Sequence, residues 1–141
     1  MKVQKLTLIR GVPGAGKSTL AKTLTDSNHS LKHFEADMFF MMDSLYTYDP
    51  TMIKSAHSWC QDATYDALNW GYDVVVSNTF VTLKELKPYF DIAKNFDIVP
   101  QVITLHANYG SIHAVPDESI NRMKSRFVND ITELYTVKEF K

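Results

Sequence analysis

The sequence predicts an α/β fold in three layers, in which a parallel sheet is covered by helices on both faces. Short apolar runs alternate along the chain with longer amphipathic stretches at helical spacing. A glycine-rich turn follows the first apolar run directly. The length of 141 residues and the 45% hydrophobic content suit one domain, covering 1–141, with a single core. Because ligands bind beyond the carboxyl ends of parallel strands, the turn after the first strand is where a site is expected.

Each element is predicted from its local pattern. Strands are predicted at 6–9, 31–35, 72–76 and 99–105, and helices at 17–25, 51–70 and 117–127. Thr82 and Glu85 resemble a capping box that opens a further helix, with Pro88 in its first turns, and Gly71 ends the helix at 51–70. No boundary is predicted within 38–48 or the last dozen residues.

The composition excludes several classes of protein. Fifteen basic and 16 acidic residues give a net charge of −1, which excludes a generally basic nucleic-acid coat and an acidic disordered tail. Any contact with nucleic acid is therefore expected to be local. The single cysteine, Cys60, cannot form an internal disulfide or a cysteine-built zinc site, so a reduced, cytoplasmic protein is expected. No run has the length of a membrane span or the pattern of a signal peptide, so no membrane partner is expected.

The turn at 11–18 reads GVPGAGKS and matches G-x-x-x-x-G-K-[ST], the phosphate-binding loop (P-loop) of nucleotide-binding proteins. Its glycines let successive N–H groups point at phosphate oxygens, and the following helix adds its positive dipole end. Lys17 is expected to reach the β- and γ-phosphates, Ser18 to bind Mg²⁺ and Thr19 to reach the α-phosphate. The predicted nucleotide-binding residues are Gly11, Gly14, Ala15, Gly16, Lys17, Ser18, Thr19 and Arg122. The predicted cofactors are ATP and Mg²⁺, although the sequence leaves ATP and GTP open as the nucleotide.

Elimination narrows the class of P-loop protein. The D-x-x-G and N-K-x-D motifs of signalling GTPases do not occur in the chain. A motor or AAA-type ATPase needs an acid at a strand end, where this chain has Ser77 and Asn78. A small kinase remains, in which an acid after the second strand activates an acceptor hydroxyl.

Asp37 suits the role of that acid, because it follows the second predicted strand in the segment FEADMFF. Its neighbours Phe34, Phe39 and Phe40 would exclude water and help to keep the carboxylate poised as a base. The alternative is that Asp37 only caps the next helix. Glu35 is a weaker rival and is expected on the strand itself.

The chain has only three arginines, and two of them, Arg122 and Arg126, are spaced i, i+4 on one predicted helix face. We predict a lid at about 106–126, in which Arg126 is the catalytic arginine and Arg122 a nucleotide contact; an arginine at the transferring phosphate is worth about a thousandfold or more in rate. The alternative is a solvated face beside Asp117 and Glu118. Arg10 abuts the P-loop, and fixing that turn to the sheet is its simpler role.

The other candidates are aromatic and histidine residues. His57 and Trp59 could contact an acceptor base, but a packed histidine and a core tryptophan explain them equally well. His113 belongs either to a phosphate-side loop or to an ordinary turn. The five histidines have no metal-ligand spacing.

Several motifs together resemble the small P-loop kinases related to polynucleotide 5′-hydroxyl kinases. They are GVPGAGKST, EAD, AHSW, VVVSNTF, KPY, IHAVP and INRMKSR, in this order between Gly11 and Arg126. The closest resemblance is to phage-encoded single-domain members. It implies a P-loop kinase-type parallel sheet, Asp37 as general base, Arg126 as lid arginine, and a role for Asn78 and Thr79 near substrate or nucleotide.

The sequence departs from this family at Phe40, where polynucleotide kinases carry an arginine that grips the acceptor phosphate. Some phage relatives resemble kinases of 5-hydroxymethyluracil in DNA, which act on a base hydroxyl. The expected acceptor is therefore a hydroxyl of DNA or another polynucleotide, with Trp59, Phe39 or Phe40 stacking on a base. A small-molecule kinase for a nucleoside, sugar or antibiotic and a non-catalytic nucleotide-binding module remain as alternatives.

Overall fold

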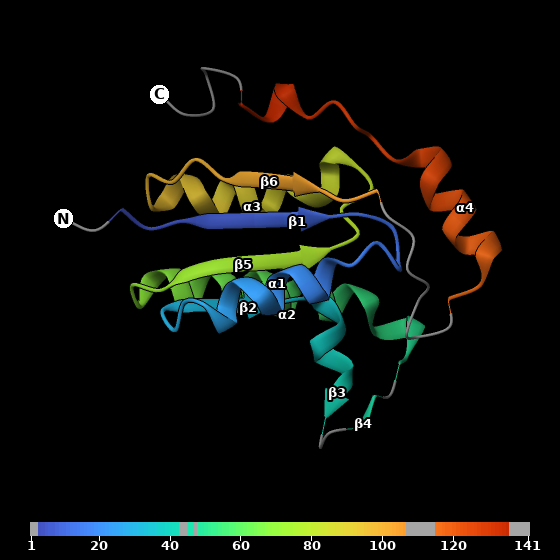
Figure 1. Cartoon of the computed structure of the whole chain (residues 1–141), viewed down its shortest axis with the longest axis horizontal. Coiled ribbons are helices and arrows are strands. Elements are labelled where there is room, and N and C mark those ends of the chain that lie inside the picture. The colour runs from blue at the N-terminus through green and yellow to red at the C-terminus, as the bar shows by residue number, and fades with distance from the viewer. Residues whose placement is uncertain (1–2, 43–44, 47, 107–114, 136–141) are drawn as a thin grey trace.

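The computed structural model describes residues 3–42, 45–46, 48–106 and 115–135. Its main sheet has four parallel strands in the order β2-β5-β1-β6 (Figure 1). These strands are β1 (Leu6–Arg10), β2 (Leu31–Phe34), β5 (Asp73–Asn78) and β6 (Gln101–Thr104). All four end at the same edge, where the P-loop lies between β1 and α1.

Four α-helices and several short elements complete the described fold. The α-helices are α1 (Lys17–Asp26), α2 (Ile53–Asn69), α3 (Leu83–Asn95) and α4 (Asp117–Arg126). Three short 3-10 helices cover Ala36–Phe40, Pro50–Met52 and Thr132–Tyr135, and β3 (Met41–Met42) pairs antiparallel with β4 (Leu45–Tyr46). Of the described helices, none is long and apolar enough to cross a bilayer.

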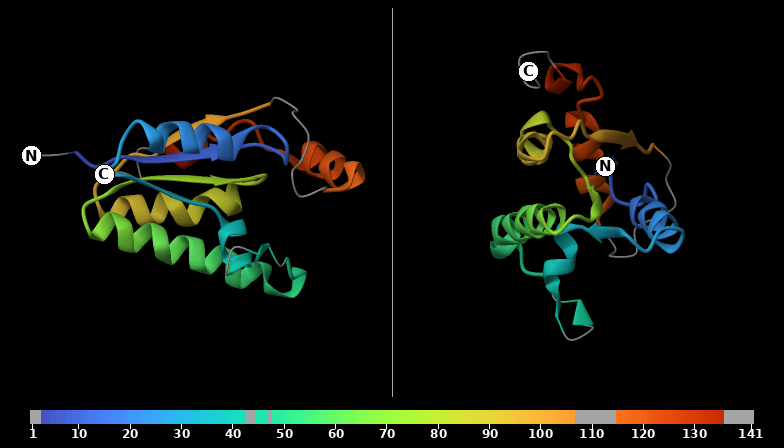
Figure 2. Two further views of the ribbon diagram at one scale, coloured as in Figure 1. Left: turned by 60° about the horizontal axis from the view of Figure 1, so that its bottom comes forward. Right: turned by 90° about the vertical axis from the view of Figure 1, so that its left-hand side faces the viewer.

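The sheet is buried on both faces, which confirms the predicted three-layer α/β fold. On one face Ile9 and Val75 pack against Ala21 of α1. On the other, Leu8 and Val76 belong to the larger core, which α2 and α3 cover. Figure 2 shows α1 on one side of the sheet and α2 and α3 on the opposite side. This arrangement explains why the two central strands, β1 and β5, carry buried apolar runs, whereas the outer strands β2 and β6 are mixed and only partly buried.

Two strand ends differ from the sequence prediction in a way that matters for the site. β2 ends at Phe34, so Glu35 follows the strand instead of lying on it. β5 continues through Ser77 to Asn78, beyond the predicted end at Val76, because both residues pair with β1. The side chains of Ser77 and Asn78 are therefore held at the carboxyl edge of the sheet.

The turn signals were predicted well. The capping box of Thr82 and Glu85 is present at the start of α3, and the helix continues through Pro88. Gly71 adopts a left-handed φ of 95° directly after the end of α2. Glycine adopts such a φ angle without the steric strain that a Cβ atom causes in other residues.

Candidate active site

The P-loop needs glycine at three positions for different reasons. Gly14 and Gly16 have left-handed φ angles of 88° and 92°, and Gly16 is the N-cap residue of α1. At Gly11, a Cβ atom would lie 2.7 Å from the carbonyl oxygen of Leu105, the residue directly after β6. The Gly11 N–H donates to the carbonyl oxygen of Thr79 at 3.2 Å, which ties the loop to the segment after β5.

Lys17 lies in the first turn of α1, and its ammonium group donates to the Val12 carbonyl at 3.1 Å, within the loop itself. Burial lowers the pKa of Lys17, whereas the carboxylates of Glu35 and Asp37 act to raise this pKa. Both acids therefore lie within electrostatic reach of the lysine. Ser18 and Thr19 are exposed at the start of the same helix.

Glu35 is the residue whose importance the sequence analysis underestimated. Its Oε2 atom accepts hydrogen bonds from the hydroxyl groups of Ser18, at 2.8 Å, and Ser77, at 2.9 Å. His33 Nε2 lies 2.7 Å from the Ser77 hydroxyl and 3.9 Å from the same carboxylate oxygen. Burial lowers the pKa of His33, and Glu35 partly opposes this shift.

Asp37 lies within the 3-10 helix Ala36–Phe40, half-buried, and Glu35 occupies the N-cap position. The alternative that Asp37 is this helix's N-cap is therefore wrong. The amide oxygen of Asn78 accepts from the Ala36 N–H at 2.9 Å, and its amide nitrogen donates to the Cys60 Sγ atom at 3.8 Å. Asn78 is buried and joins the segment that carries Asp37 to β5 and α2.

Phe40 requires a correction, because the sequence analysis offered it as a stacking residue for an acceptor base. Its side chain is 6% exposed, belongs to the main core and contacts the rings of Phe39 and Tyr48 edge-on. No exposed face is left for a base. Trp59 is half-buried and packs edge-to-face on Phe34, with ring centroids 6.2 Å apart.

A pocket of about 200 Å³ opens between α2 and α3. Its lining residues are His57, Gln61, Phe80, Lys84, Glu85 and Pro88. Phe80 closely follows β5, so the pocket lies toward the carboxyl edge of the sheet. Of the predicted acceptor residues, His57 lines this pocket.

The three arginines occupy different environments. Arg10 is fully buried; its Nε and Nη2 atoms donate to the Phe80 carbonyl at 3.0 and 2.7 Å, and its guanidinium lies 4.1 Å from the Phe127 ring centroid. This supports its simpler role of fixing the turn. Arg122 is exposed and lies 3.8 Å from Glu118, within α4.

Arg126 is exposed in the last turn of α4, and Figure 1 shows this helix beyond the carboxyl ends of the strands. Over the described part of the chain, neither Arg122 nor Arg126 forms a hydrogen bond or ion pair with the P-loop. The predicted lid is described only at 106 and from 115 onward, and His113 lies outside the described residues.

A family model described as an AAA domain matches residues 6–109, which include the P-loop, the Glu35–Asp37 segment and all four strands of the main sheet. The chain belongs to this family. The family's description carries the AAA name, but it does not overturn the prediction made from Ser77 and Asn78 against a motor or AAA-type ATPase, because β5 does lack the acid. The fold is that of P-loop kinases, as the structural comparisons below show.

Known proteins and structures support this placement. The human NEDD4-binding protein 2 is 33% identical over 90 residues, which are 63% of this chain and 5% of that protein. The structure of a Pnkp1/Rnl/Hen1 complex matches with a TM-score of 0.60 at 19% identity, covering all of this chain and 45% of the other. A putative kinase from Chloroflexus aurantiacus gives 0.61 at 20% identity, over 74% and 60% of the chains.

The APS kinase CysC of Mycobacterium tuberculosis matches with a TM-score of 0.60 at 12% identity, covering 87% of this chain and 96% of the other. These structural similarities establish the fold. This chain spans less than two thirds of the length of three of these proteins: NEDD4-binding protein 2, the matched chain of the Pnkp1/Rnl/Hen1 complex and the Chloroflexus protein.

The residues present fit the nucleotide and Mg²⁺ that this family implies. Main-chain N–H groups, the Lys17 ammonium and the start of α1 suit phosphate oxygens, and the Ser18 hydroxyl is a hard oxygen ligand of the kind Mg²⁺ prefers. Among the described residues, no three His, Cys, Asp or Glu side chains lie together in a group that could hold a metal ion.

Proposed function

We propose that this chain is an ATP-dependent kinase that transfers the γ-phosphate to a hydroxyl group of nucleic acid. The observation that carries the proposal is the pair of carboxylates, Glu35 and Asp37, placed beside Lys17 of a P-loop. Nucleotide binding requires only the loop, whereas hydroxyl activation requires a base near the phosphates. Asp37 is that base in the proposal.

The P-loop N–H groups and Lys17 hold the β- and γ-phosphates. Asp37 accepts the proton that the acceptor hydroxyl loses as its oxygen bonds to the γ-phosphorus, and the bond from phosphorus to the bridging oxygen of the departing diphosphate breaks. Bound Mg²⁺, held by Ser18, would supply positive charge on the phosphates. Arg126 is proposed to add charge from α4 as the transfer proceeds.

The proposed acceptor is the base hydroxyl of 5-hydroxymethyluracil in phage DNA or the 5′-hydroxyl of a polynucleotide. Support comes from the motifs shared with the polynucleotide-kinase-like family, and the near-neutral charge favours a short contact over a long one. His57, Trp59 and Thr79 remain the proposed substrate-side residues, whereas buried Asn78, bonded to Ala36 and Cys60, is proposed to act through the segment that carries Asp37. The buried Phe40, in place of a phosphate-gripping arginine, favours the base hydroxyl over a 5′ end.

A small-molecule kinase is the second candidate, and the pocket between α2 and α3 favours it. Its volume of about 200 Å³ suits a nucleoside or sugar. A nucleoside or sugar would fit such a pocket by itself, whereas a DNA duplex would need a wide groove.

Two variants test the catalytic part of the proposal. Lys17→Ala should lose nucleotide affinity and transfer together, because it removes the charge on the phosphates. Asp37→Asn should keep nucleotide affinity while transfer falls about a hundredfold or more. Asp66→Asn, an exposed change of the same chemistry on α2, serves as the control and should leave both properties unchanged. Near wild-type transfer by the Asp37 variant would remove Asp37 from the mechanism.

The acceptor is tested with γ-labelled ATP and three acceptors: an oligonucleotide with a 5′-hydroxyl, DNA containing 5-hydroxymethyluracil, and a mixture of nucleosides and sugars. Label in the 5-hydroxymethyluracil DNA but not in the 5′-hydroxyl oligonucleotide would agree with Phe40 standing where polynucleotide kinases carry the arginine that binds the acceptor phosphate. Label in the third alone would replace the nucleic-acid proposal with the small-molecule one. A protein that binds ATP but labels nothing and releases no phosphate would be a nucleotide-binding module.

A further inference from the structure

The ends of β2 and β5 and the start of α1 bring three oxygen-bearing side chains together: Ser18, Glu35 and Ser77. The two hydroxyl groups donate to the same carboxylate oxygen, Oε2 of Glu35. No hydrogen bond from the described residues reaches the other oxygen, Oε1, although the Glu35 side chain is only 20% exposed. A partly buried carboxylate with an unused oxygen beside the expected Mg²⁺ ligand is therefore a candidate ligand itself.

The strand order explains why the acid comes from β2. β5 is the direct neighbour of β1, and a carboxylate at its carboxyl end would face the P-loop, but this chain has Ser77 there. β2 is the next strand outward, and the longer side chain of Glu35 extends past Ser77 to Ser18. The carboxylate beside Ser18 therefore comes from the end of β2, and β5 contributes a hydroxyl group that binds this carboxylate.

We propose that Glu35 completes the divalent-cation site at Ser18, by direct ligation or through a metal-bound water, and that Ser77 positions its carboxylate. This inference rests on the proposed function for the presence of a nucleotide at the P-loop. It assigns separate roles to the two acids of the EAD segment: Glu35 serves the cation and Asp37 serves the acceptor.

The directions of the hydrogen bonds agree with this role. Ser18 gives its only hydroxyl proton to Glu35, so the lone pairs of its oxygen remain free for a cation. Ser77 also gives its proton to Glu35, so His33 must donate from Nε2 to the Ser77 oxygen. The chain from His33 through Ser77 to Glu35 thus holds the carboxylate in one orientation, as the outer partners of metal ligands commonly do.

A structural role for Glu35, in which it only satisfies two hydroxyl groups, predicts a different response to substitution. In Glu35→Gln the amide oxygen can still accept from both hydroxyls, so the hydrogen bonds persist while the charge disappears. A purely structural residue would tolerate this change. A cation ligand would not, because Mg²⁺ and Mn²⁺ prefer charged oxygen ligands.

The test measures Mn²⁺ binding to the protein–ADP complex by electron paramagnetic resonance, together with ADP affinity in the presence of a chelator. Ser77→Ala should weaken Mn²⁺ binding about tenfold, since loss of an outer partner typically costs about 10–100-fold in metal affinity, and Glu35→Gln, which removes the proposed ligand itself, should weaken it by more. Asp37→Asn removes an equal charge two residues away and should change Mn²⁺ affinity less than about twofold. Metal-free ADP should bind Glu35→Gln as tightly as wild type or more tightly, because a negative charge near the phosphates is gone.

Wild-type Mn²⁺ affinity in folded Glu35→Gln would overturn the inference, as would an equal loss in Asp37→Asn or the absence of Mn²⁺ binding by the wild-type ADP complex. If Glu35→Gln does not fold, Glu35→Asp keeps the charge on a shorter side chain. It should bind Mn²⁺ more weakly than wild type yet more tightly than Glu35→Ala, and equal affinity of these two variants would overturn the inference. Failure to phosphorylate any acceptor, with the Mn²⁺ results as expected, would overturn the proposed function alone.

Discussion

Single residues determine the shape of the phosphate-binding turn, and Gly11 shows this most directly. Its missing side chain allows the loop to lie against the end of β6, where a Cβ atom would be 2.7 Å from the Leu105 carbonyl oxygen and 3.0 Å from the Ala15 Cβ atom. The first of these neighbours is main chain and cannot rotate away. The position therefore needs glycine because of close approach and not because of its φ angle.

Gly11→Ala is expected to destabilise the protein by about 1–3 kcal/mol, as overpacking does, and to weaken ADP binding because the turn must shift. Gly71→Ala is the matched control. Its Cβ would meet nothing within 4 Å, so only its left-handed φ of 95° is strained, and ADP affinity should stay unchanged. Urea unfolding and ADP titration of both variants check this. Unchanged ADP affinity in Gly11→Ala would contradict the packing argument.

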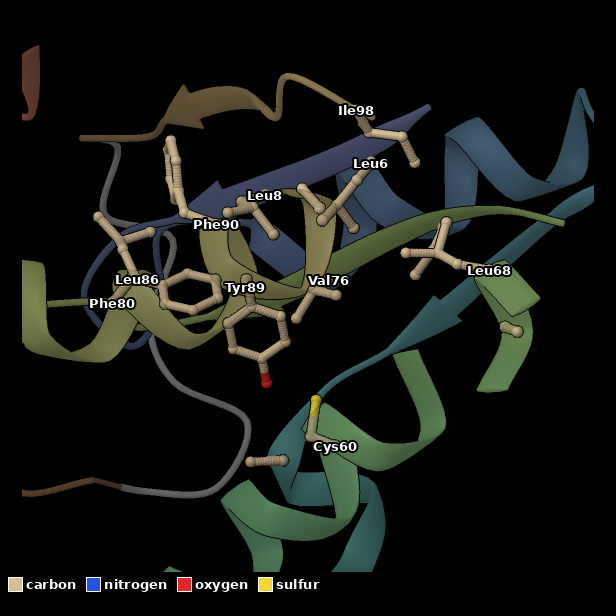
Figure 3. Packing of buried hydrophobic residues seen from close by; sticks show 14 of the residues in the cluster. Leu6, Leu8, Cys60, Leu68, Val76, Phe80, Leu86, Tyr89, Phe90 and Ile98 are labelled. Atoms are coloured by element: carbon tan, nitrogen blue, oxygen red, sulfur yellow. The ribbon is translucent and has the colours of Figure 1, made fainter. Parts of the chain in front are cut away.

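Cys60 shows how burial controls a side chain's chemistry. The thiol is fully buried on α2 and accepts a hydrogen bond from the amide of Asn78. Figure 3 shows the Tyr89 hydroxyl group pointing toward it. Burial raises the pKa of this thiol, so less thiolate is present at a given pH. Native protein should therefore react far more slowly with iodoacetamide than protein unfolded in urea.

The same shift predicts a pH dependence of stability. The unfolded chain loses the Cys60 proton near pH 8.5, whereas the folded protein retains it, so the stabilisation is complete below about pH 8.5 and declines above it. The free energy of unfolding should therefore begin to fall near pH 8.5 and should keep falling until the pH passes the raised pKa of the folded protein. Cys60→Ala, although less stable because of its cavity, should show a smaller fall. An equal fall in both proteins would assign the dependence to other groups.

At the scale of one element, α3 begins with interactions that are entirely local. The Thr82 N–H and hydroxyl approach the Glu85 carboxylate at 2.9 and 3.1 Å, and Glu85 also acts electrostatically on buried Arg10. The start of this helix therefore supports the loop after β5, whose Phe80 carbonyl binds Arg10.

Thr82→Ala should lower the free energy of unfolding by about 1 kcal/mol, the usual cost of losing an N-cap side chain. The measurement is the urea midpoint at constant m-value. Thr132→Ala, which removes a hydroxyl from an exposed turn near the end of the described chain, is the control and should cost less. Equal losses would show that the capping box adds nothing beyond an ordinary turn.

At the scale of the whole molecule, the segment at 131–135 closes the core beside α3 and β6. Leu134 is buried, and the Tyr135 hydroxyl donates to the Pro100 carbonyl at 2.6 Å while its ring packs on Phe90. The sequence carries no signal for this segment, because one buried leucine in a short 3-10 helix has no periodicity.

Leu134→Ala should destabilise the protein by about 2–4 kcal/mol through lost burial and a cavity. Tyr135→Phe should cost only about 1 kcal/mol, because the ring contact with Phe90 persists while one hydrogen bond is lost. Thermal and urea unfolding of both variants check the order of these effects. A Leu134→Ala protein as stable as wild type would show that the segment lies on the core without closing it.

The sequence by itself determined the features that depend on neighbours within a few positions. The P-loop, the capping box at Thr82 and the left-handed Gly71 follow rules of spacing along one stretch of chain. The three-layer parallel fold followed from the alternation of apolar runs with amphipathic stretches. Asp37 was selected by its place after a strand, and its catalytic role remains a prediction.

Only the tertiary structure decided what lies beside the P-loop serine. Glu35 and Ser77 are 42 positions apart, and their contact depends on β5 lying between β2 and β1. No local pattern encodes strand order, which arises from the packing of all layers together. The same reason explains Phe40, which looked available to a base in the sequence but is buried where the 3-10 helix that carries it packs against α2.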